Sequence, residues 1–415
     1  MRNTNLHINK FQIFRKFIFL MVSFVLLFSC VEEIALQNFN KINLLIVQAE
    51  LTDELKNHIV KLSRTIPLDS VTEKHETSAT VHITDNLGNR YLFSEFEPGS
   101  YKSTTAFRAE EGSSYKLHIK TIDGEVYESA SQKITGKNDI SELYVIPDTN
   151  ISNELGVSII VESNNENTTA KYYKYTYEET YIVKAPYWSP DSLKIISANS
   201  RNPILELIKK PNNALERRIC YKTNFSNTII QTETNSLSTN STKHSIRFIA
   251  QKNSIIWHRY SMLAIQHIQS YEGYTYYKTL NKLSTDENVF SQVQPGYLQG
   301  NIFPTKDADN RVIGFFEVNS ISKKRFFFNF SDIYPVHKIN FQGPCFYLLE
   351  WPYLIDPLNN ANESYGSPLI AAITYFGLVY AKENGSVDRP YFVVPIQCTD
   401  CRYTASNKKP TFWID

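Results

Sequence analysis

The sequence reads YYKYTYEETYIVK from Tyr172 to Lys184, and the alternation of apolar and polar residues in this stretch decides the fold class. Five positions of one face hold large, mostly apolar residues: Tyr173, Tyr175, Tyr177, Tyr181 and Val183. The positions between them are mostly polar or charged: Lys174, Thr176, Glu178 and Lys184. Because successive side chains of a β-strand point to opposite faces, this period of two predicts a half-buried strand.

Shorter patterns of the same kind precede this segment between Asn43 and about Lys133. The run at 44–51 is strongly apolar, and later runs alternate or are rich in β-branched residues: 58–62, 80–83, 91–93, 99–102, 114–120 and 125–130. Two connections, 85–89 and 122–125, contain the Gly that hairpin loops prefer. About seven short strands in this space predict an immunoglobulin-like β-sandwich over residues 43–138.

The rest of the chain is predicted to be a larger β-rich domain with few helices. Residues 139–153, broken by Pro147, are expected to form a linker, and residues 154–415 the second domain. One helix is predicted at 271–283, capped by Ser270, because Tyr274, Tyr277 and Leu280 recur at helical spacing. Strands are predicted again at 311–319 and 324–330. The expected fold class is therefore mainly β.

The first 29 residues have the layout of a secretory signal. Four basic residues and no acid precede an apolar run at 17–28, which is shorter than the roughly 20 residues that a spanning helix needs. The run ends in Leu27-Phe28-Ser29-Cys30, which resembles a bacterial lipobox. The alternative is an ordinary signal peptide with an incidental cysteine. We expect residues 1–29 to be removed, Cys30 to carry the lipid, and residues 30–42 to act as tether and linker.

Two acids directly follow that cysteine. Glu32 and Glu33 resemble the acidic export tag of lipoproteins that reach the cell surface in Bacteroidetes, although a solvated acidic linker is the alternative. The expected location is the outer membrane, lipid-anchored and facing the cell exterior.

Charge and cysteine content narrow the classes of function. The chain has 43 basic and 42 acidic side chains without a cluster of Lys and Arg, which argues against nucleic acid as a partner. Besides Cys30 there are four cysteines, Cys220, Cys345, Cys398 and Cys401. In an oxidising compartment they predict two disulfides, with three possible pairings. Alternatively, the Cys398-Thr-Asp-Cys401 motif is half of a zinc site or a redox pair.

No catalytic constellation is visible. The sequence has no GxSxG elbow, no HExxH motif and no Gly-rich phosphate loop, and its histidines lack metal-ligand spacing. His82 and His118 fall in predicted strands and are expected on a sheet face. Glu178 and Glu179 would point to opposite faces of a strand, so this pair cannot flank one glycosidic bond. We therefore expect no enzyme, no metal site and no cofactor.

Aromatic segments are the better candidates for binding. Tyr187 and Trp188 lie in a loop braced by two prolines, and Trp351 and Tyr353 flank Pro352. Loops on rigid scaffolds often carry recognition, although a buried plug is an equal alternative for both pairs. The tyrosines at 172–181 and 271–277 offer another possible recognition face, with core packing as the favoured alternative.

The sequence resembles a family of Bacteroidetes outer-membrane lipoproteins labelled domain of unknown function 4249. The resemblance rests on short motifs along nearly all of the mature chain: 51–53, 60–65, 79–85, 99–101, 115–119, 123–124, 220–223, 259–261, 300–302, 314–316, 324–325, 398–402 and 409–413. Family members usually have Gly-Gly where Ala405-Ser406 stands here, so this loop is expected to differ in shape.

The resemblance implies an amino-terminal sandwich of the carboxypeptidase-regulatory or immunoglobulin type, followed by a β-rich domain. It also implies an accessory role beside an outer-membrane TonB-dependent transporter. The expected function is a non-catalytic accessory or substrate-capturing partner of such a transporter. The alternatives are a structural subunit of an outer-membrane assembly or secretion complex, and an enzyme whose site forms only in the fold.

Overall fold

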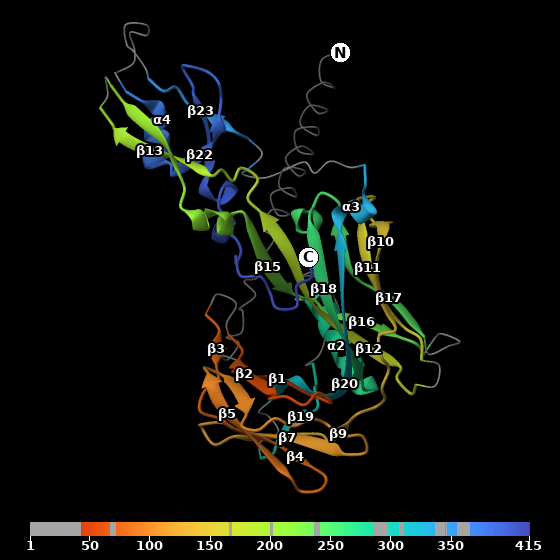
Figure 1. Cartoon of the computed structure of the whole chain (residues 1–415). Helices are drawn as coiled ribbons and strands as arrows, with labels where there is room; N and C mark the ends of the chain where they lie inside the picture. The colour runs from red at the N-terminus through yellow and green to blue at the C-terminus, as the bar shows by residue number, and fades with distance from the viewer. Residues whose placement is uncertain are drawn as a thin grey trace, which may run out of the picture. The chain divides into compact units, whose positions relative to one another are not determined.

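Long β-strands dominate the structure, so the prediction of a mainly β fold is confirmed (Figure 1). The computed structural model describes residues 43–66, 72–165, 168–199, 202–235, 241–285, 298–306, 311–336, 345, 347–354 and 366–415. Cys30, Glu32, Glu33 and the signal segment lie outside these ranges. Within the described residues, no helix combines the length and the hydropathy needed to cross a membrane.

The strands and helices of the described residues follow in chain order. The first part holds β1 (Leu45–Thr52), β2 (Ile59–Arg64), β3 (Lys74–His75), β4 (Thr80–Asp85), β5 (Arg90–Glu97), β6 (Ser100–Ser103), β7 (Ser114–Lys120), β8 (Val126–Ser129), β9 (Gln132–Lys133), β10 (Glu142–Thr149) and β11 (Leu155–Ser163). The middle holds β12 (Tyr172–Lys184), β13 (Asp191–Ser197), β14 (Ile204–Lys209), η1 (Asn212–Arg217), β15 (Ile219–Phe225), β16 (Ile230–Glu233), β17 (Thr242–Ala250), η2 (Ser254–Ile256), β18 (Arg259–Gln269) and α2 (Tyr271–Thr285). The last part holds β19 (Ile302–Pro304), β20 (Val312–Asn329), α3 (Phe330–Ile333), β21 (Leu349–Glu350), α4 (Pro368–Tyr375), β22 (Leu378–Glu383), β23 (Tyr391–Pro395), η3 (Ile396–Cys398) and η4 (Cys401–Tyr403).

The amino-terminal strands surround one hydrophobic core. They are hydrogen-bonded in the order β1-β2-β6-β5-β4-β7-β8-β19, and every pair in this path is antiparallel. The odd-numbered residues of β1 (Leu45, Val47, Ala49 and Leu51) point into this core, as the period of two requires. The predicted strand at 114–120 coincides with β7.

A long strand near the carboxyl-terminal end of the sequence joins this sheet. β20 pairs in parallel with β1, from Leu45↔Val312 to Thr52↔Asn319, and its second half pairs antiparallel with β18. The strands predicted separately at 311–319 and 324–330 are thus one continuous strand. Since β19 pairs with β8 as well, strands of the predicted second domain extend the sheet of the predicted first domain.

The motifs at 300–302 and 314–316 meet where β20 crosses the first core. A Cβ at Gly300 would lie 1.6 Å from the carbonyl oxygen of Gly314, so only glycine permits this approach. The buried amide of Asn301 donates to Phe316 O at 2.9 Å and accepts from Phe316 N at 2.8 Å. The amide therefore satisfies two backbone groups of β20 that would otherwise be buried without partners.

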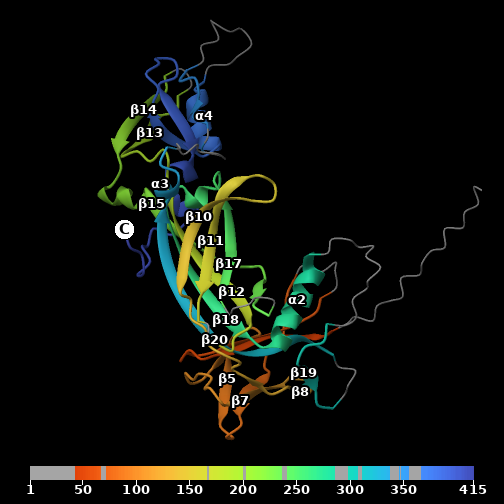
Figure 2. The ribbon, with the colours of Figure 1, turned by 90° about the vertical axis from the view of Figure 1, so that its right-hand side faces the viewer.

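A second core lies between β12-β18-β20 and the small sheet β10-β11-β17 (Figure 2). The tyrosines of β12 that alternate in the sequence, Tyr173, Tyr175, Tyr177 and Tyr181, are all buried in it. Their stripe is core packing, as the favoured alternative predicted. Glu178 and Glu179 lie on opposite faces: Glu178 pairs with Arg325 at 2.9 Å, while Glu179 is buried and accepts from Tyr260 Oη at 2.8 Å.

The segment predicted as a linker, 139–153, contains strand β10. Leu143 and Val145 face the second core, and β10 pairs with β11 along its whole length. Pro147 is accommodated because β10 is the outer strand of its three-stranded sheet in the described residues, and outer strands tolerate proline. Pro147, from which the sequence predicts a linker, therefore lies within a strand.

The prediction of two disulfides is confirmed, and the structure gives their pairing. Cys220 pairs with Cys401 and Cys345 with Cys398, with Cα–Cα distances of 5.7 and 5.5 Å. The two cysteines of the CxxC motif therefore bond to different partners. Through them the end of the chain is linked to β15 and to the segment before β21.

Candidate functional site at helix α2

The aromatic pair at Tyr187 and Trp188 lies between the two disulfides. Tyr187 packs with the Cys345–Cys398 disulfide, and its N–H donates to Cys398 O at 2.9 Å. Trp188 packs with the Cys220–Cys401 disulfide, and the guanidinium of Arg218 lies 5.8 Å from its ring centroid. Both side chains are half-buried, so packing accounts for much of their surface. Their contact with a partner stays a prediction.

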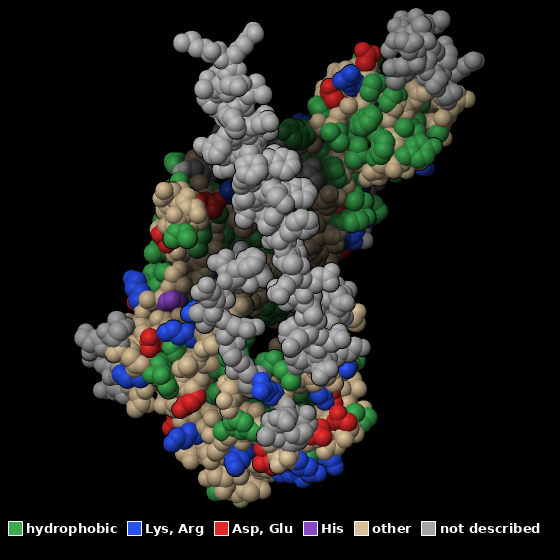
Figure 3. Space-filling model, turned by 180° about the vertical axis from the view of Figure 1, so that it is seen from behind, with side chains coloured by type: hydrophobic (Ala, Val, Ile, Leu, Met, Phe, Trp, Pro, Cys, Tyr) green, Lys and Arg blue, Asp and Glu red, His purple; other side chains and the backbone are tan. Residues whose placement is uncertain are grey.

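Trp351 and Tyr353 pack on the core beside α4. The hydroxyl of Tyr353 donates to Pro203 O at 2.8 Å, and Trp351 stacks on Phe376 with ring centroids 6.0 Å apart. Phe376 and the neighbouring Tyr375 are 66% and 81% exposed. Hydrophobic side chains gather on one face of the region that holds α4, as Figure 3 shows. Trp351 thus borders an exposed aromatic surface, whereas the hydroxyl of Tyr353 is hydrogen-bonded to the backbone at Pro203.

Four charged or titratable side chains from four strands converge on the face of the large sheet that α2 covers. Lys174 of β12 donates to Glu317 of β20, and its ammonium lies 3.5 Å from Glu50 of β1. His267 Nδ1 of β18 hydrogen-bonds Glu50 Oε1 at 2.9 Å. We call Glu50, Lys174, His267 and Glu317 the polar cluster.

Amides and a hydroxyl add further hydrogen bonds to the polar cluster. Asn319 donates to Glu50 Oε1 at 2.8 Å, and Gln269 donates to Glu317 Oε1 at 2.6 Å. Thr176 Oγ1 hydrogen-bonds His267 Nε2 at 3.0 Å. Buried ionic groups are tolerated when they are both paired and hydrogen-bonded, and this cluster meets both conditions.

The cluster fixes the ionisation of Glu50 and Lys174. Burial alone would raise the pKa of Glu50, but the charges of His267 and Lys174 and hydrogen bonds from His267 and Asn319 hold it well below its usual value. Burial alone would lower the pKa of Lys174, but the carboxylates of Glu317 and Glu50 raise it above its usual value. Glu50 is therefore an anion and Lys174 a cation at neutral pH.

An apolar cavity of about 530 Å³ opens beside this cluster. We call it the α2–β1 groove. It is lined by β1, β2, β12, β20 and α2 through Ile46, Val47, Gln48, Ala49, Glu50, Ile59, Lys61, Lys174, Tyr276, Tyr277, Leu280, Ile313, Gly314, Phe315 and Glu317. Glu50, Lys174 and Glu317 form its polar end, and most of the remaining lining is apolar. A largely apolar pocket with a few convergent polar groups is the usual form of a small-molecule site.

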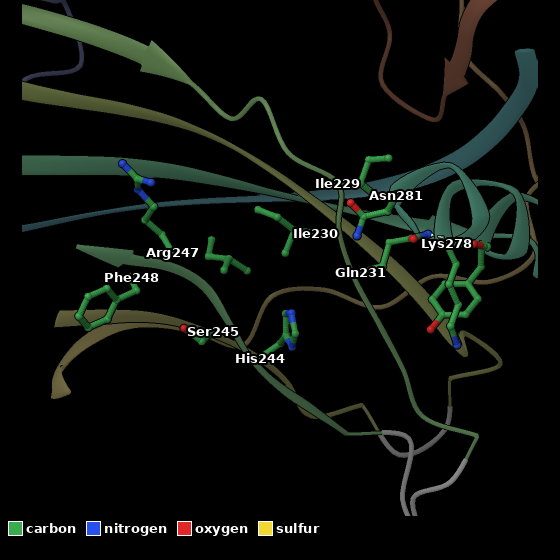
Figure 4. Close-up of a pocket in the computed structure, with 11 residues that line it drawn as sticks. Ile229, Ile230, Gln231, His244, Ser245, Arg247, Phe248, Lys278 and Asn281 are labelled. Carbon is green, nitrogen blue, oxygen red and sulfur yellow. Dashed lines mark hydrogen bonds between the residues drawn. The ribbon is translucent and has the colours of Figure 1, made fainter. Parts of the chain in front are cut away.

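A second cavity, of about 460 Å³, lies between β16, β17 and α2 (Figure 4). Arg247 and Phe248 lie at one end of it and Lys278 and Asn281 at the other, with Ile230 between them. We call it the α2–β17 cavity. Its wall residue Gln231 donates to Gln269 Oε1 at 2.6 Å, and Gln269 in turn binds Glu317. A continuous hydrogen-bond network therefore runs from this cavity to the α2–β1 groove.

Helix α2 forms a wall of both cavities. It begins where Ser270 Oγ accepts from Gly273 N at 3.1 Å, as the sequence predicts. Tyr274, Lys278 and Asn281 line the α2–β17 cavity, whereas Tyr276, Tyr277 and Leu280 line the α2–β1 groove. Tyr277 also contacts the polar cluster, since its ring centroid lies 4.6 Å from Lys174 Nζ. The tyrosines of 271–277 are thus divided between packing and cavity walls, while Tyr271 is exposed.

The sequence did not single out the polar cluster, because its members come from strands up to 267 positions apart. Two polar exceptions were visible: Glu50 is the only charged residue of β1, and Glu317 is the only charged residue among residues 312–322 of β20. Such exceptions on a buried face need partners.

The histidines predicted on a sheet face, His82 and His118, lie in β4 and β7 and stack with ring centroids 4.6 Å apart. Burial and the neighbouring charges of Arg90 and His118 lower the pKa of His82 to about 4. Within the described ranges, no group of three His, Cys, Asp or Glu side chains has the geometry to hold a metal ion.

Comparisons with known proteins give a family and a distant structural match. No curated protein sequence matches the chain. A solved DUF4785 family protein from Legionella pneumophila aligns with 50% of this chain at 9% identity and a TM-score of 0.17, and the chain spans 56% of that protein. The model of the domain of unknown function DUF4249 matches residues 32–325, so the chain belongs to this family.

Proposed function

We propose that the protein is a surface-exposed outer-membrane lipoprotein, tethered through Cys30, that acts as a non-catalytic accessory or substrate-capturing partner of a TonB-dependent transporter. The observation that carries this proposal is the state of the cysteines. All four beyond Cys30 are disulfide-bonded, and disulfides persist in oxidising compartments outside the cytoplasm. The remaining cysteine follows a short apolar run in the lipobox-like sequence Leu27–Cys30.

Binding is favoured over catalysis by the state of the polar cluster. A general acid or base needs a proton that it can exchange near the working pH. Glu50 is held ionised by its partners, and Glu317 accepts from both Lys174 and Gln269. Side chains that are paired with each other in this way are better suited to stabilising the structure of a site than to transferring protons.

For the partner contact we propose the exposed aromatic surface at Tyr375, Phe376 and Trp351. Helix α4, which ends at Tyr375, carries no charged residue. Depletion of charge and enrichment in aromatic residues are typical of the central part of protein–protein interfaces. Tyr187 and Trp188 remain candidates for the partner contact, and their side chains are less exposed than those of Tyr375 and Phe376.

The proposal also includes a more specific fold for the amino-terminal part of the chain. We propose that residues 43–138 form a sandwich of the immunoglobulin or carboxypeptidase-regulatory type. The support is the antiparallel order of β2 to β8 around one core and the regular spacing of the connecting turns.

The test is a gentle purification of the tagged full-length protein from solubilised outer membranes, followed by quantitative mass spectrometry. A transporter recovered in stoichiometric amount is the expected result. Recovery of assembly or secretion components instead would favour the structural alternative, and recovery of the protein alone would contradict both.

Variants of the proposed contact surface sharpen this test. Phe376→Ser and Tyr375→Ser should reduce recovery of the transporter, because they remove exposed aromatic area. Leu87→Ser is the matched control, since Leu87 is 77% exposed in the β4–β5 connection. Equal loss in the control and the two variants would refute the assignment of the surface.

A further inference from the structure

The α2–β1 groove has an aliphatic body that nothing in the proposed function explains. Ile46 and Ile313 lie side by side on its floor, because β1 and β20 pair in register there. Ile59 of β2 and Leu280 of α2 line its sides, and Ile59 is 42% exposed. An apolar ligand in this space would remove these side chains from water, which is favourable in proportion to the area covered.

The lining of the groove as a whole is balanced in formal charge. Among the described residues that line the groove, Lys61 and Lys174 carry a positive formal charge and Glu50 and Glu317 a negative one, so these formal charges cancel. Their exposure differs: the side chains of Glu317 and Lys174 are 2% and 13% exposed, whereas that of Glu50 is 30% exposed. A ligand entering the groove therefore meets the carboxylate of Glu50 before the deeper ion pair.

This balance selects the head group of a ligand. An anionic head would lie beside the carboxylates of Glu50 and Glu317, and a cationic head beside the ammonium of Lys174. Each ionised head would also meet a group of opposite sign, so attraction and repulsion largely offset each other, while taking the charged head out of water costs free energy. A hydroxyl carries no charge, donates to a carboxylate and accepts from an ammonium, so it suits both groups at this end.

We propose that the α2–β1 groove binds an uncharged aliphatic molecule that ends in a hydroxyl, with the hydroxyl at Glu50 and the chain along Ile46, Ile313 and Leu280. This site is independent of the lipid tether and of any transporter. Its confirmation or failure therefore leaves the proposed function untouched.

The experiment titrates the purified full-length protein with 1-octanol, octylammonium and octanoate by ligand-detected NMR. We expect octanol to bind at least about tenfold more tightly than either charged probe, because hydrogen bonds to charged groups contribute on this scale. Across hexanol, heptanol and octanol, affinity should rise about fourfold per added methylene. Equal affinity for the three octyl probes would overturn the assignment of the head group.

Two variants locate the site. Leu280→Trp should fill the groove and abolish octanol binding. Ser284→Trp, at an exposed position of the same helix, should leave binding unchanged. If octanol binds both variants as it binds the wild type, the groove is not the site.

A third variant tests the contact with Glu50 without changing the volume of the groove. Glu50→Gln should weaken octanol binding about tenfold, since an amide oxygen is a weaker acceptor than a carboxylate. It remains informative even if Leu280→Trp fails to fold. Unchanged octanol affinity in Glu50→Gln would overturn the placement of the hydroxyl.

Discussion

The ammonium of Lys174 lies between the carboxylates of Glu50 and Glu317, where little water reaches it. Removing it leaves the two carboxylates close together without the ammonium between them, whereas removing one carboxylate as well relieves part of this cost. The polar cluster therefore joins β1, β12 and β20 through interactions that depend on one another.

Lys174→Met is expected to lower the free energy of unfolding by about 3–5 kcal/mol, because the buried carboxylate of Glu317 loses its cationic partner. Adding Glu317→Gln should restore at least about 1 kcal/mol of this loss, since the two residues are coupled. Urea unfolding followed by circular dichroism measures both effects.

Lys243→Met is the control for the Lys174→Met variant. Lys243 pairs with Glu162 at 3.1 Å, but its side chain is 66% exposed, so its loss should cost no more than about 1 kcal/mol. Equal costs at Lys174 and Lys243 would contradict the role of the polar cluster.

Glu50 makes stability depend on pH. Because its pKa is lower in the folded protein than in the unfolded chain, its contribution is present above about pH 4.5 and is lost as pH falls through the folded pKa. Between pH 6 and pH 3 the wild type should therefore lose more unfolding free energy than Glu50→Gln. Equal losses in urea titrations at the two pH values would show that Glu50 does not titrate with a lowered pKa.

At the scale of elements, the local sequence pattern located individual strands and the helix. It did not show which strands distant in the sequence pair with each other. Alternation located β7 and β12, and the helical spacing of Tyr274, Tyr277 and Leu280 located α2. The strand β10 was missed because Pro147 reads as a break unless the strand is known to lie at a sheet edge. The parallel pairing of β1 with β20 joins segments more than 250 positions apart, so no local pattern could reveal it.

The same limit applies to the candidate site. The lipid and disulfide cysteines could be proposed because each cysteine carries its own chemistry. The polar cluster could not, since its four members become neighbours only through the pairing of β1, β20, β18 and β12.

The carboxyl-terminal segment around Trp413 packs as an element of its own on β15 and β20. Trp413 is 5% exposed and contacts Tyr221 and Phe327, with ring centroids 5.1 and 5.6 Å away. The preceding Phe412 lies under the guanidinium of Arg325, 3.5 Å from its ring centroid. The motif at 409–413, which lies beyond the residues 32–325 matched by the family model, is therefore a packing motif.

Trp413→Ala should lower the free energy of unfolding by about 3 kcal/mol, because it removes a large buried aromatic side chain. Ile414→Ala serves as the control, since Ile414 is 61% exposed and should change stability by less than about 0.5 kcal/mol. Thermal unfolding measures both. A cost below about 1 kcal/mol at Trp413 would mean that the segment contributes little to the fold.

At the scale of the whole molecule, the disulfides link parts that are distant in the sequence. Cys220–Cys401 spans 181 positions and Cys345–Cys398 spans 53. Cross-links that close longer loops remove more entropy from the unfolded chain, although the dependence on loop length is weak.

Replacing each pair by serine is expected to lower the free energy of unfolding by about 5 kcal/mol for Cys220–Cys401 and about 4 kcal/mol for Cys345–Cys398. Urea unfolding of the two double variants tests this order. A larger loss from the shorter loop would show that local packing around Tyr187, rather than chain entropy, dominates.

The measurement that tests the functional account most directly is mass spectrometry of the amino-terminal peptide of the protein isolated from its native membranes. The account predicts a chain that begins at Cys30 and carries diacylglycerol on the thiol. A chain cut at another position, or one with an unmodified Cys30, would contradict the tether and with it the proposed role at the outer membrane.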